Sequence, residues 1–311
     1  MPDVVVHASF GNEVLEALEP AVREKIIPGI YTMGLFGPDV WFLYQPWKRR
    51  EGRGRRMHTT RTGDFLAALA ARGKESARRE EVFSYLSGFL CHYALDSVTH
   101  PYIIYRTTEE FHYKKCHTAF EHSLDRCQMT RDGVWGERHP ITEYYLPALQ
   151  LPEGMAPDLD AVYEEIYGWK NALSATNLSY NRFRQVYRIM EDPRGFGAHL
   201  ARLTRSGVLR GFVYSESPFA DVDVENLAHA PWRHSHEESL ISTDSFPELR
   251  ARAAAQAREW IAAAYDTLWT GRLRLEELKK LIGNNSYLSG LPMGDPRNMK
   301  VKSLLPPSTP S

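Results

Sequence analysis

Apolar residues cover almost the whole circumference of one predicted helix, which begins near Val82. They are Val82, Phe83, Tyr85, Leu86, Phe89, Leu90, Tyr93, Ala94 and Leu95. A helix that is apolar on all sides lies inside a protein rather than on its surface. The residue before a proline is disfavoured in helical geometry, so we expect this helix to end near His100, before Pro101.

Apolar residues at helical spacing predict further helices along the chain. These cover residues 10–26, 64–71, 143–150, 159–173, 177–190, 196–214, 246–270 and 275–282. Residues 31–47 are rich in aromatic and turn-forming residues without a helical period, and the chain shows no convincing strand pattern or internal repeat. The sequence therefore predicts an all-α protein, with a single multi-helix domain over residues 1–291 and a loose tail over 292–311.

Composition places the chain among ordinary globular proteins. Its 311 residues are 43% hydrophobic and 25% charged, and the net charge of -1 gives no overall attraction to nucleic acid or a membrane. Three cysteines, an odd number, fit a reducing compartment better than a disulfide framework. Neither a signal peptide nor a transmembrane stretch is found, and no amphipathic membrane-binding helix stands out. We expect a cytoplasmic protein, and its oligomeric state is left open.

Histidine and acidic residues recur at intervals of four along the central helix and just after it. His92, Asp96 and His100 form one series, and His117 and Glu121 form another. Side chains four apart lie on one face of a helix, close enough to bind the same cation. A buried imidazole or carboxylate must be paired or bind a metal, because leaving it without a partner costs several kcal/mol.

The same interval also occurs at His139/Glu143 and His234/Glu238. A single pair of this kind is more often a hydrogen-bonded pair on a helix surface than a metal site. Only the pairs on and just after the central helix adjoin an apolar frame. For those we favour metal binding over satisfied core pairs.

Eight residues in all are candidate metal ligands. They are His7, Asp39, His58, His92, Asp96, His100, His117 and Glu121. Eight nitrogen and oxygen ligands are too many for one tetrahedral zinc and enough for two or three ions, and Asp96 could bridge two of them. Imidazole-rich sites suit zinc or iron better than magnesium or calcium. Such a site best serves phosphate-ester hydrolysis, in which a metal-activated water attacks phosphorus.

The motifs resemble the zinc-dependent phospholipase C family, which is related in fold to single-strand-specific zinc nucleases. The resemblance rests on five pieces in order: His7 to Glu16, Gly37-Pro38-Asp39, Met57-His58, Gly88 to Ile103, and His117-x3-Glu121. It implies an all-helical fold with three zinc ions. It places Asp39, His58, His92 and Asp96 on one ion, His100, His117 and Glu121 on a second, and His7 with Asp96 on a third. In the family, the residue at the position of Asp39 is also discussed as a general base.

A basic segment from Lys48 to Arg56 lies between Asp39 and His58, with six basic side chains against one acidic one. A solvated loop is the simpler interpretation, and the alternative is a loop that attracts an anionic substrate to the site. Nearby aromatic residues could line a pocket for a lipid headgroup or stack a base, although most are expected in the core. They are Phe36, Trp41, Phe42, Tyr44 and Trp47.

Three functions are compatible with these features. We favour a zinc-dependent phosphodiester hydrolase of the phospholipase C type, whose substrate is a phosphodiester of the lipid-headgroup or nucleotide type. A nuclease or nucleotide phosphoesterase would use the same trinuclear site, and nucleic acid is the less favoured substrate. The third alternative is a non-catalytic binding module that metal stabilises.

Overall fold

The computed structural model describes residues 4–45, 47, 52–110, 117–135, 141–192, 194–204, 213–214 and 219–298. Helices dominate this part of the chain, so the prediction of an all-α, multi-helix domain is confirmed. Its one sheet is a hairpin of β1 (Trp232–His234) and β2 (Glu237–Ser242), which the sequence did not predict. The hairpin is held to the core by Trp232, whose ring centroid lies 5.3 Å from that of Tyr102. Across the described ranges, every helix is too short or too polar to span a membrane.

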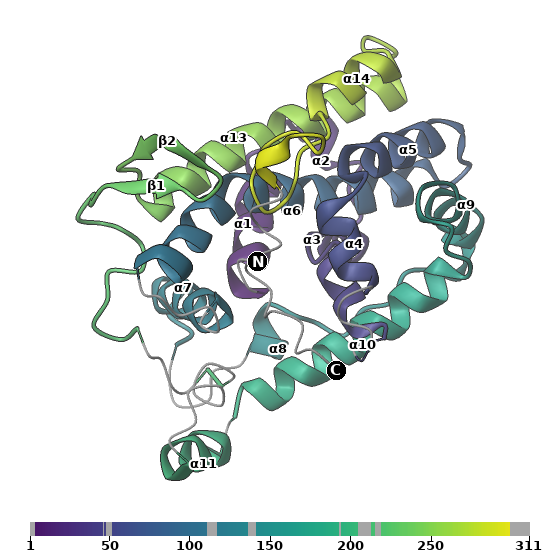
Figure 1. Ribbon diagram of the computed structural model, residues 1–311. Helices are drawn as coiled ribbons and strands as arrows, with labels where there is room; N and C mark the ends of the chain where they lie inside the picture. Colours follow the sequence, from purple (N-terminus) through teal and green to yellow (C-terminus); the bar gives the residue numbers. More distant parts are fainter. Residues whose placement is uncertain are drawn as a thin grey trace, which may run out of the picture.

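The helices follow one another through most of the chain (Figure 1). They are α1 (Val4–Glu16), α2 (Pro20–Arg23), α3 (Pro28–Leu35), α4 (Arg53–Thr59), α5 (Thr62–Glu75), α6 (Arg79–Tyr105), α7 (His117–Arg131), α8 (Ile141–Tyr144), α9 (Ala156–Tyr167), α10 (Ala172–Met190), α11 (Phe196–Thr204), α13 (Phe246–Tyr265) and α14 (Leu275–Ile282). A 3-10 helix, η1 (Asp39–Leu43), follows α3.

Helix α6 forms the centre of the molecule, where α1, α3, α5 and α13 pack around it (Figure 1). Every residue from Val82 to Asp96 is buried, as the apolar circumference requires. The prediction that this helix ends near His100 is wrong, because it continues through Pro101 to Tyr105. Pro101 cannot donate a hydrogen bond to the Ser97 carbonyl, but burial of the helix on all sides offsets that loss.

Three other predicted boundaries are also wrong, each for a local reason. The helix expected over 10–26 divides into α1, which begins at Val4 and ends at Glu16, and α2, which begins at Pro20 because proline suits the first turn of a helix. The helix expected over 159–173 divides at Gly168, whose φ of 73° ends α9 in the left-handed conformation. The helix expected over 143–150 is reduced to the short α8.

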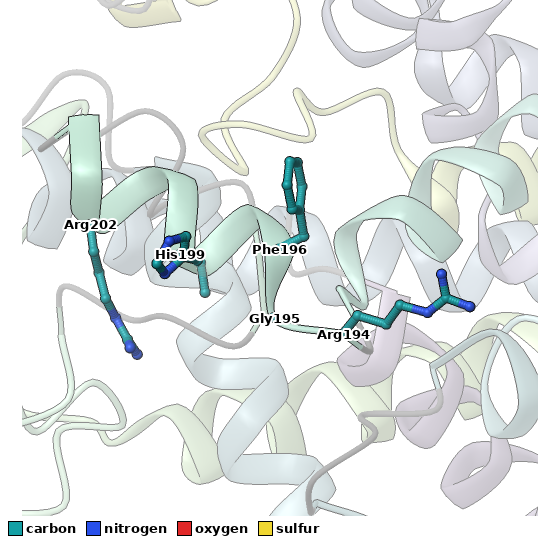
Figure 2. Close-up of a pocket in the computed structure, with 6 residues that line it drawn as sticks. Arg194, Gly195, Phe196, His199 and Arg202 are labelled. Carbon is teal, nitrogen blue, oxygen red and sulfur yellow. The ribbon is translucent and has the colours of Figure 1, made fainter.

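Helix α11 lies at the edge of the molecule, far from α6 (Figure 1). It ends at Thr204, and the described residues Val213 and Tyr214 are not helical, so the predicted helix over 196–214 is too long. A hollow beside it is lined by Arg194, Gly195, Phe196, Ala198, His199 and Arg202 (Figure 2).

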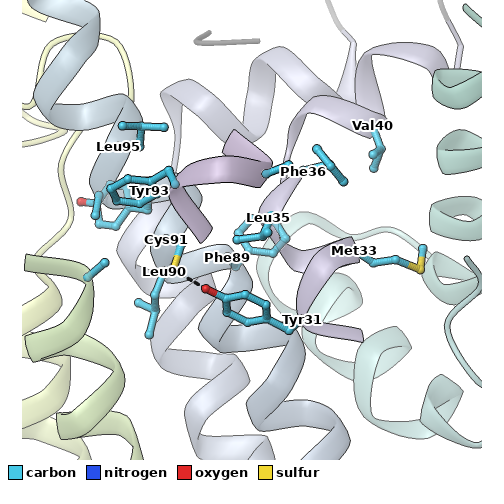
Figure 3. Close-up of a cluster of buried hydrophobic side chains, with 14 of the residues drawn as sticks. Tyr31, Met33, Leu35, Phe36, Val40, Phe89, Leu90, Cys91, Tyr93 and Leu95 are labelled. Atoms are coloured by element: carbon cyan, nitrogen blue, oxygen red, sulfur yellow. Dashed lines mark hydrogen bonds between the residues drawn. The ribbon is translucent and has the colours of Figure 1, made fainter. Parts of the chain in front are cut away.

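The main chains of α3 and α6 touch where Gly34 meets Gly88. A Cβ atom added at Gly88 would lie 2.1 Å from the Tyr31 carbonyl oxygen, so a larger residue at this position would force α3 and α6 apart. The Tyr31 hydroxyl donates to the Gly11 carbonyl at 2.7 Å and lies 3.1 Å from Cys91 Sγ (Figure 3). This close crossing brings the end of α3 against the middle of α6.

After α14 the chain folds back onto α5 and α6. The Asn285 amide donates to the Tyr93 hydroxyl at 2.7 Å, and the Thr62 hydroxyl donates to the Asn285 carbonyl at 2.6 Å. These bonds hold the buried residue Tyr287 beside α6. The tail predicted over 292–311 lies mostly outside the described residues, but Pro292 pairs with Asn285 in an isolated β-bridge.

Candidate metal centre

All eight candidate ligands converge, although they come from five different elements. His7 lies in α1, Asp39 begins η1, His58 lies in α4, His92, Asp96 and His100 lie in α6, and His117 and Glu121 lie in α7. Seven of the eight are buried, and His117 is the exception with 34% of its side chain exposed. Solvent therefore reaches the cluster most readily at the α7 side.

The first group combines Asp39, His58, His92 and Asp96. Asp39 Oδ1 lies 3.0 Å from His58 Nε2 and 3.7 Å from His92 Nε2. Asp96 Oδ2 lies 3.2 Å from His92 Nε2 and 3.8 Å from His58 Nε2. Two imidazole nitrogens and two carboxylate oxygens thus surround one point, which is the donor set of a zinc or iron site.

Asp96 faces two directions at once. While its Oδ2 points to His58 and His92, its Oδ1 lies 3.3 Å from His7 Nε2. The His7 ring stacks on that of His92 with centroids 4.1 Å apart and an interplanar angle of 7°. This geometry lets one carboxylate serve two neighbouring cation positions.

A further group forms where α6 meets α7. Glu121 Oε1 lies 2.9 Å from His117 Nε2 and 3.8 Å from His100 Nε2. The His100 and His117 rings stack with centroids 5.7 Å apart. Among the residues that the structure describes, three groups of side chains could therefore hold a metal ion: His7/Asp39/His92, His58/His92/Asp96 and His100/His117/Glu121.

Main-chain carbonyls orient three of the imidazoles. His58 Nδ1 lies 2.7 Å from the Gly54 carbonyl oxygen, and His92 Nδ1 lies 2.9 Å from that of Leu35. His100 Nδ1 lies 2.8 Å from the Tyr287 carbonyl oxygen. A carbonyl oxygen can only accept, so each Nδ1 must carry the proton and each Nε2 presents its lone pair to the cluster. This outer arrangement is typical of metal-binding histidines.

The family model for zinc dependent phospholipase C matches residues 6–178, which is more than half of the chain. The chain belongs to this family. The match contains all eight candidate ligands and confirms the resemblance of the motifs. No curated protein and no solved structure matches the chain.

The zinc dependence of the phospholipase C family agrees with the state of the buried polar atoms. Within the described residues, both Asp96 carboxylate oxygens and the Nε2 atoms of His7, His58, His92 and His100 have no hydrogen-bond partner. Buried polar atoms are rarely left in this state, because each costs about 1–3 kcal/mol. Cations bound at the three groups would satisfy these atoms, so the residues present fit the metal that the family requires.

The pKa shifts of most of these groups also favour metal binding, whereas for His92 the lowering effect of burial is outweighed by Asp96 and Asp39, so its pKa is raised. Burial lowers the pKa of both His7 and His100, so these imidazoles are neutral near pH 7, which is the form that binds a metal. Burial would raise the pKa of Asp96, but the nearby His100 and His92 hold it well below its usual range. Burial likewise opposes ionisation of Glu121, yet His117 helps to keep its pKa low. Asp96 and Glu121 are therefore ionised.

The phospholipase C motifs do not contain every residue that shapes the centre. The carbonyls of Leu35, Gly54 and Tyr287 carry no sequence signal, because every residue has a carbonyl group. Tyr287 is also outside the matched residues, and its ring centroid lies 5.1 Å from that of His58. The C-terminal segment therefore completes a site that the N-terminal half supplies with ligands.

The metal-binding groups among the described residues contain no residue of the other His/acid pairs. His139 lies outside the described residues. His234 is in the β1 strand, where its Nε2 lies 3.1 Å from the Ser289 carbonyl oxygen. The interpretation of His234 and Glu238 as a pair on a helix surface is wrong, because both residues belong to the β1–β2 hairpin.

Part of the basic segment packs against aromatic rings. Residues 48–51 lie outside the described ranges, but Arg53 and Arg56 belong to α4. The Arg53 guanidinium lies 4.1 Å from the Tyr44 ring centroid and 4.7 Å from that of Trp169. These cation–π contacts attach the described part of the segment to the core.

The aromatic residues near Asp39 divide into two sets. Phe36 and Trp41 are buried, as expected, whereas Trp47 is 72% exposed. Phe42 is 37% exposed, and its ring centroid lies 5.2 Å from that of His58. Phe42 is therefore an apolar surface beside the candidate ligands that solvent, or a substrate, can reach.

Proposed function

We propose that the chain is a zinc-dependent phosphodiester hydrolase that cleaves the headgroup phosphodiester of a phospholipid. The observation that carries this proposal is the convergence of buried carboxylates on imidazole Nε2 atoms that have no hydrogen-bond partner within the described residues, those of His7, His58, His92 and His100. Membership of the zinc-dependent phospholipase C family supports the lipid substrate. Phe42, exposed beside His58, offers the apolar contact that a lipid substrate needs.

We assign two or three zinc ions to the centre. Asp39, His58, His92 and Asp96 would hold one ion, and His100, His117 and Glu121 a second. His7 with Asp96 Oδ1 would hold the third, which is consistent with the different directions of the two Asp96 oxygens. Bound zinc would lower the pKa of a water molecule and stabilise the negative charge on the phosphate.

Asp39 is the carboxylate best suited to move a proton. Its side chain is 7% exposed, whereas that of Asp96 is fully buried, so water can approach Asp39 more easily. A general base must lie within hydrogen-bond reach of the attacking water. We assign Asp39 both an ion-binding oxygen, Oδ1, and a role as proton acceptor.

The nuclease alternative receives less support from the structure. Its predicted anion-attracting loop would use the basic side chains of Lys48 to Arg56, and two of those in the described part of the chain, Arg53 and Arg56, lie over aromatic rings instead. A cytoplasmic location also belongs to this proposal, and the free thiols of Cys91 and Cys127 are compatible with a reducing compartment.

The Asp96→Asn variant tests the function. Asn keeps the size of Asp but removes the charge that two cation positions share. We expect wild-type protein to contain two or three zinc ions per chain by elemental analysis and to cleave phosphatidylcholine. The variant should lose at least one ion and roughly 100-fold or more in activity, since even outer-sphere substitutions reduce affinity or activity by about 10–100-fold.

The exposed Glu164→Gln change is the matched control, because Glu164 only faces Lys170 at 3.5 Å. Folded protein that takes up no zinc, or full activity in Asp96→Asn, would exclude the proposed mechanism. Faster cleavage of oligonucleotides than of lipid would favour the nuclease alternative. Zinc binding without cleavage of any phosphoester would favour the metal-stabilised binding module.

A further inference from the structure

Helix α11 packs Gly197 and Ala198 against the protein and turns its large apolar residues outward. Ala198 is buried, and a Cβ atom at Gly197 would lie 2.8 Å from Val213 Cγ1. Phe196 and Leu203 are instead 73% and 70% exposed, and Leu200 is 39% exposed. A helix that only needed to fold would bury the larger side chains, because they gain more free energy on leaving water.

The three exposed residues form one continuous ridge. Phe196, Leu200 and Leu203 are spaced four and three residues apart, so they lie on a single face of the helix. The helix is anchored from its start, since Asp192 accepts hydrogen bonds from the Gly197 and Ala198 amides at 3.0 and 2.8 Å. The ridge is therefore held outward by the fold, and such exposed patches usually mark an interaction site.

Basic side chains flank the ridge. Arg194, His199 and Arg202 line the hollow beside α11, and Phe196 points away from Arg202 (Figure 2). Residues 194–204 contain no acidic residue. A helix with an apolar face and a basic flank has the chemistry that binds the interface of an anionic lipid bilayer.

We propose that α11 docks the protein on anionic phospholipid membranes. Phe196, Leu200 and Leu203 enter the boundary between headgroups and acyl chains, while Arg194 and Arg202 contact lipid phosphates. A second copy of the chain fits this surface less well, because a symmetric contact would bring the arginines of both copies together. The choice of lipid rests in part on the proposed function. The helix itself lies outside the residues that the family model matches.

Vesicle binding tests this surface without any turnover. Wild-type protein should sediment with phosphatidylcholine vesicles that contain about one-third phosphatidylglycerol. The Phe196→Ser/Leu203→Ser double variant should partition at least about tenfold more weakly, because two large apolar side chains are removed from the interface. Arg194→Gln/Arg202→Gln should lose about tenfold and with it the preference for anionic over neutral vesicles.

The matched control is Ile241→Ser, which removes a 68% exposed apolar side chain from β2, a strand well separated from α11 (Figure 1). It should bind vesicles like wild type. Hydrolysis of a water-soluble phosphodiester should be equal in the ridge variant and in wild type. Vesicle binding without hydrolysis would contradict only the proposed function and would leave the docking surface intact.

Two results would overturn the docking surface. One is the absence of the proposed binding, shown either by wild-type protein that does not bind anionic vesicles or by a ridge variant that binds them as tightly as wild type. The other is a wild-type dimer in sedimentation equilibrium that the ridge variant converts to monomer, which would assign the ridge to self-association.

Discussion

At the scale of single residues, Asp125 fixes the position of the candidate ligand His7, although Asp125 is not itself a candidate ligand. Its carboxylate accepts hydrogen bonds from the amides of Val5 and Val6, at 3.2 and 2.9 Å, and from the Tyr214 hydroxyl at 2.7 Å. The first amides of a helix have no partner within the helix and carry a partial positive charge. Asp125, which belongs to α7, therefore fixes the start of α1 and the position of His7.

Substitution Asp125→Asn should destabilise the protein by about 1–3 kcal/mol, because the amide leaves at least one of three buried donors without an acceptor. Urea unfolding measures this change. Zinc affinity should fall for the ion that His7 would bind. The exposed Glu259→Gln change in the interior of α13 is the control, with no expected effect on either quantity. Equal stability of Asp125→Asn and wild type would contradict this account of α1.

At the scale of elements, the crossing of α3 and α6 connects packing to the metal centre. The same close approach that Gly34 and Gly88 permit also brings the Leu35 carbonyl to His92 Nδ1. The backbone contact and the orientation of the imidazole are therefore one structural feature. A change in the spacing of the two helices would move both.

Substitution Gly88→Ala should destabilise the protein by about 1–3 kcal/mol or more, because the new methyl group would meet main-chain atoms that cannot rotate away. Both the melting temperature and the zinc affinity should fall, because a displaced α3 would move the Leu35 carbonyl away from His92. Gly294→Ala is the control, because a Cβ atom there meets open space. If zinc affinity is kept while stability falls, the carbonyl does not control His92.

The elements also show where sequence patterns fail. The apolar circumference correctly predicts that α6 is central, because burial on all sides follows from the residues themselves. The effect of Pro101 is not predictable in the same way, because its cost is small beside the contacts of a fully buried helix. For α11, periodicity indicates a helix but not which face the protein covers.

At the scale of the whole molecule, zinc should contribute to folding stability. The centre joins α1, α4, α6 and α7, so an ion bound there stabilises the folded chain and not the unfolded one. An ion at about 1,000 times its Kd contributes about 4 kcal/mol. At about 2–4 °C per kcal/mol, chelation should lower Tm by roughly 10 °C, and added zinc should restore it.

Differential scanning calorimetry with and without chelator checks this prediction. Asp96→Asn should respond less to chelator than wild type does, because it holds fewer ions. A wild-type Tm that chelator leaves unchanged, in protein that contains zinc, would show that the ions do not hold these helices together.

The sequence by itself determined the central helix and the eight candidate ligands. Intervals of four place side chains on one face of a helix whatever the rest of the chain does, and buried imidazoles and carboxylates need partners. Only the tertiary structure decided that Leu35, Gly54 and Tyr287 orient the imidazoles, because carbonyl groups are the same in every residue and their use depends on which segments meet. It also decided that α11 turns its large apolar residues outward, since exposure depends on what packs against the helix rather than on its own spacing.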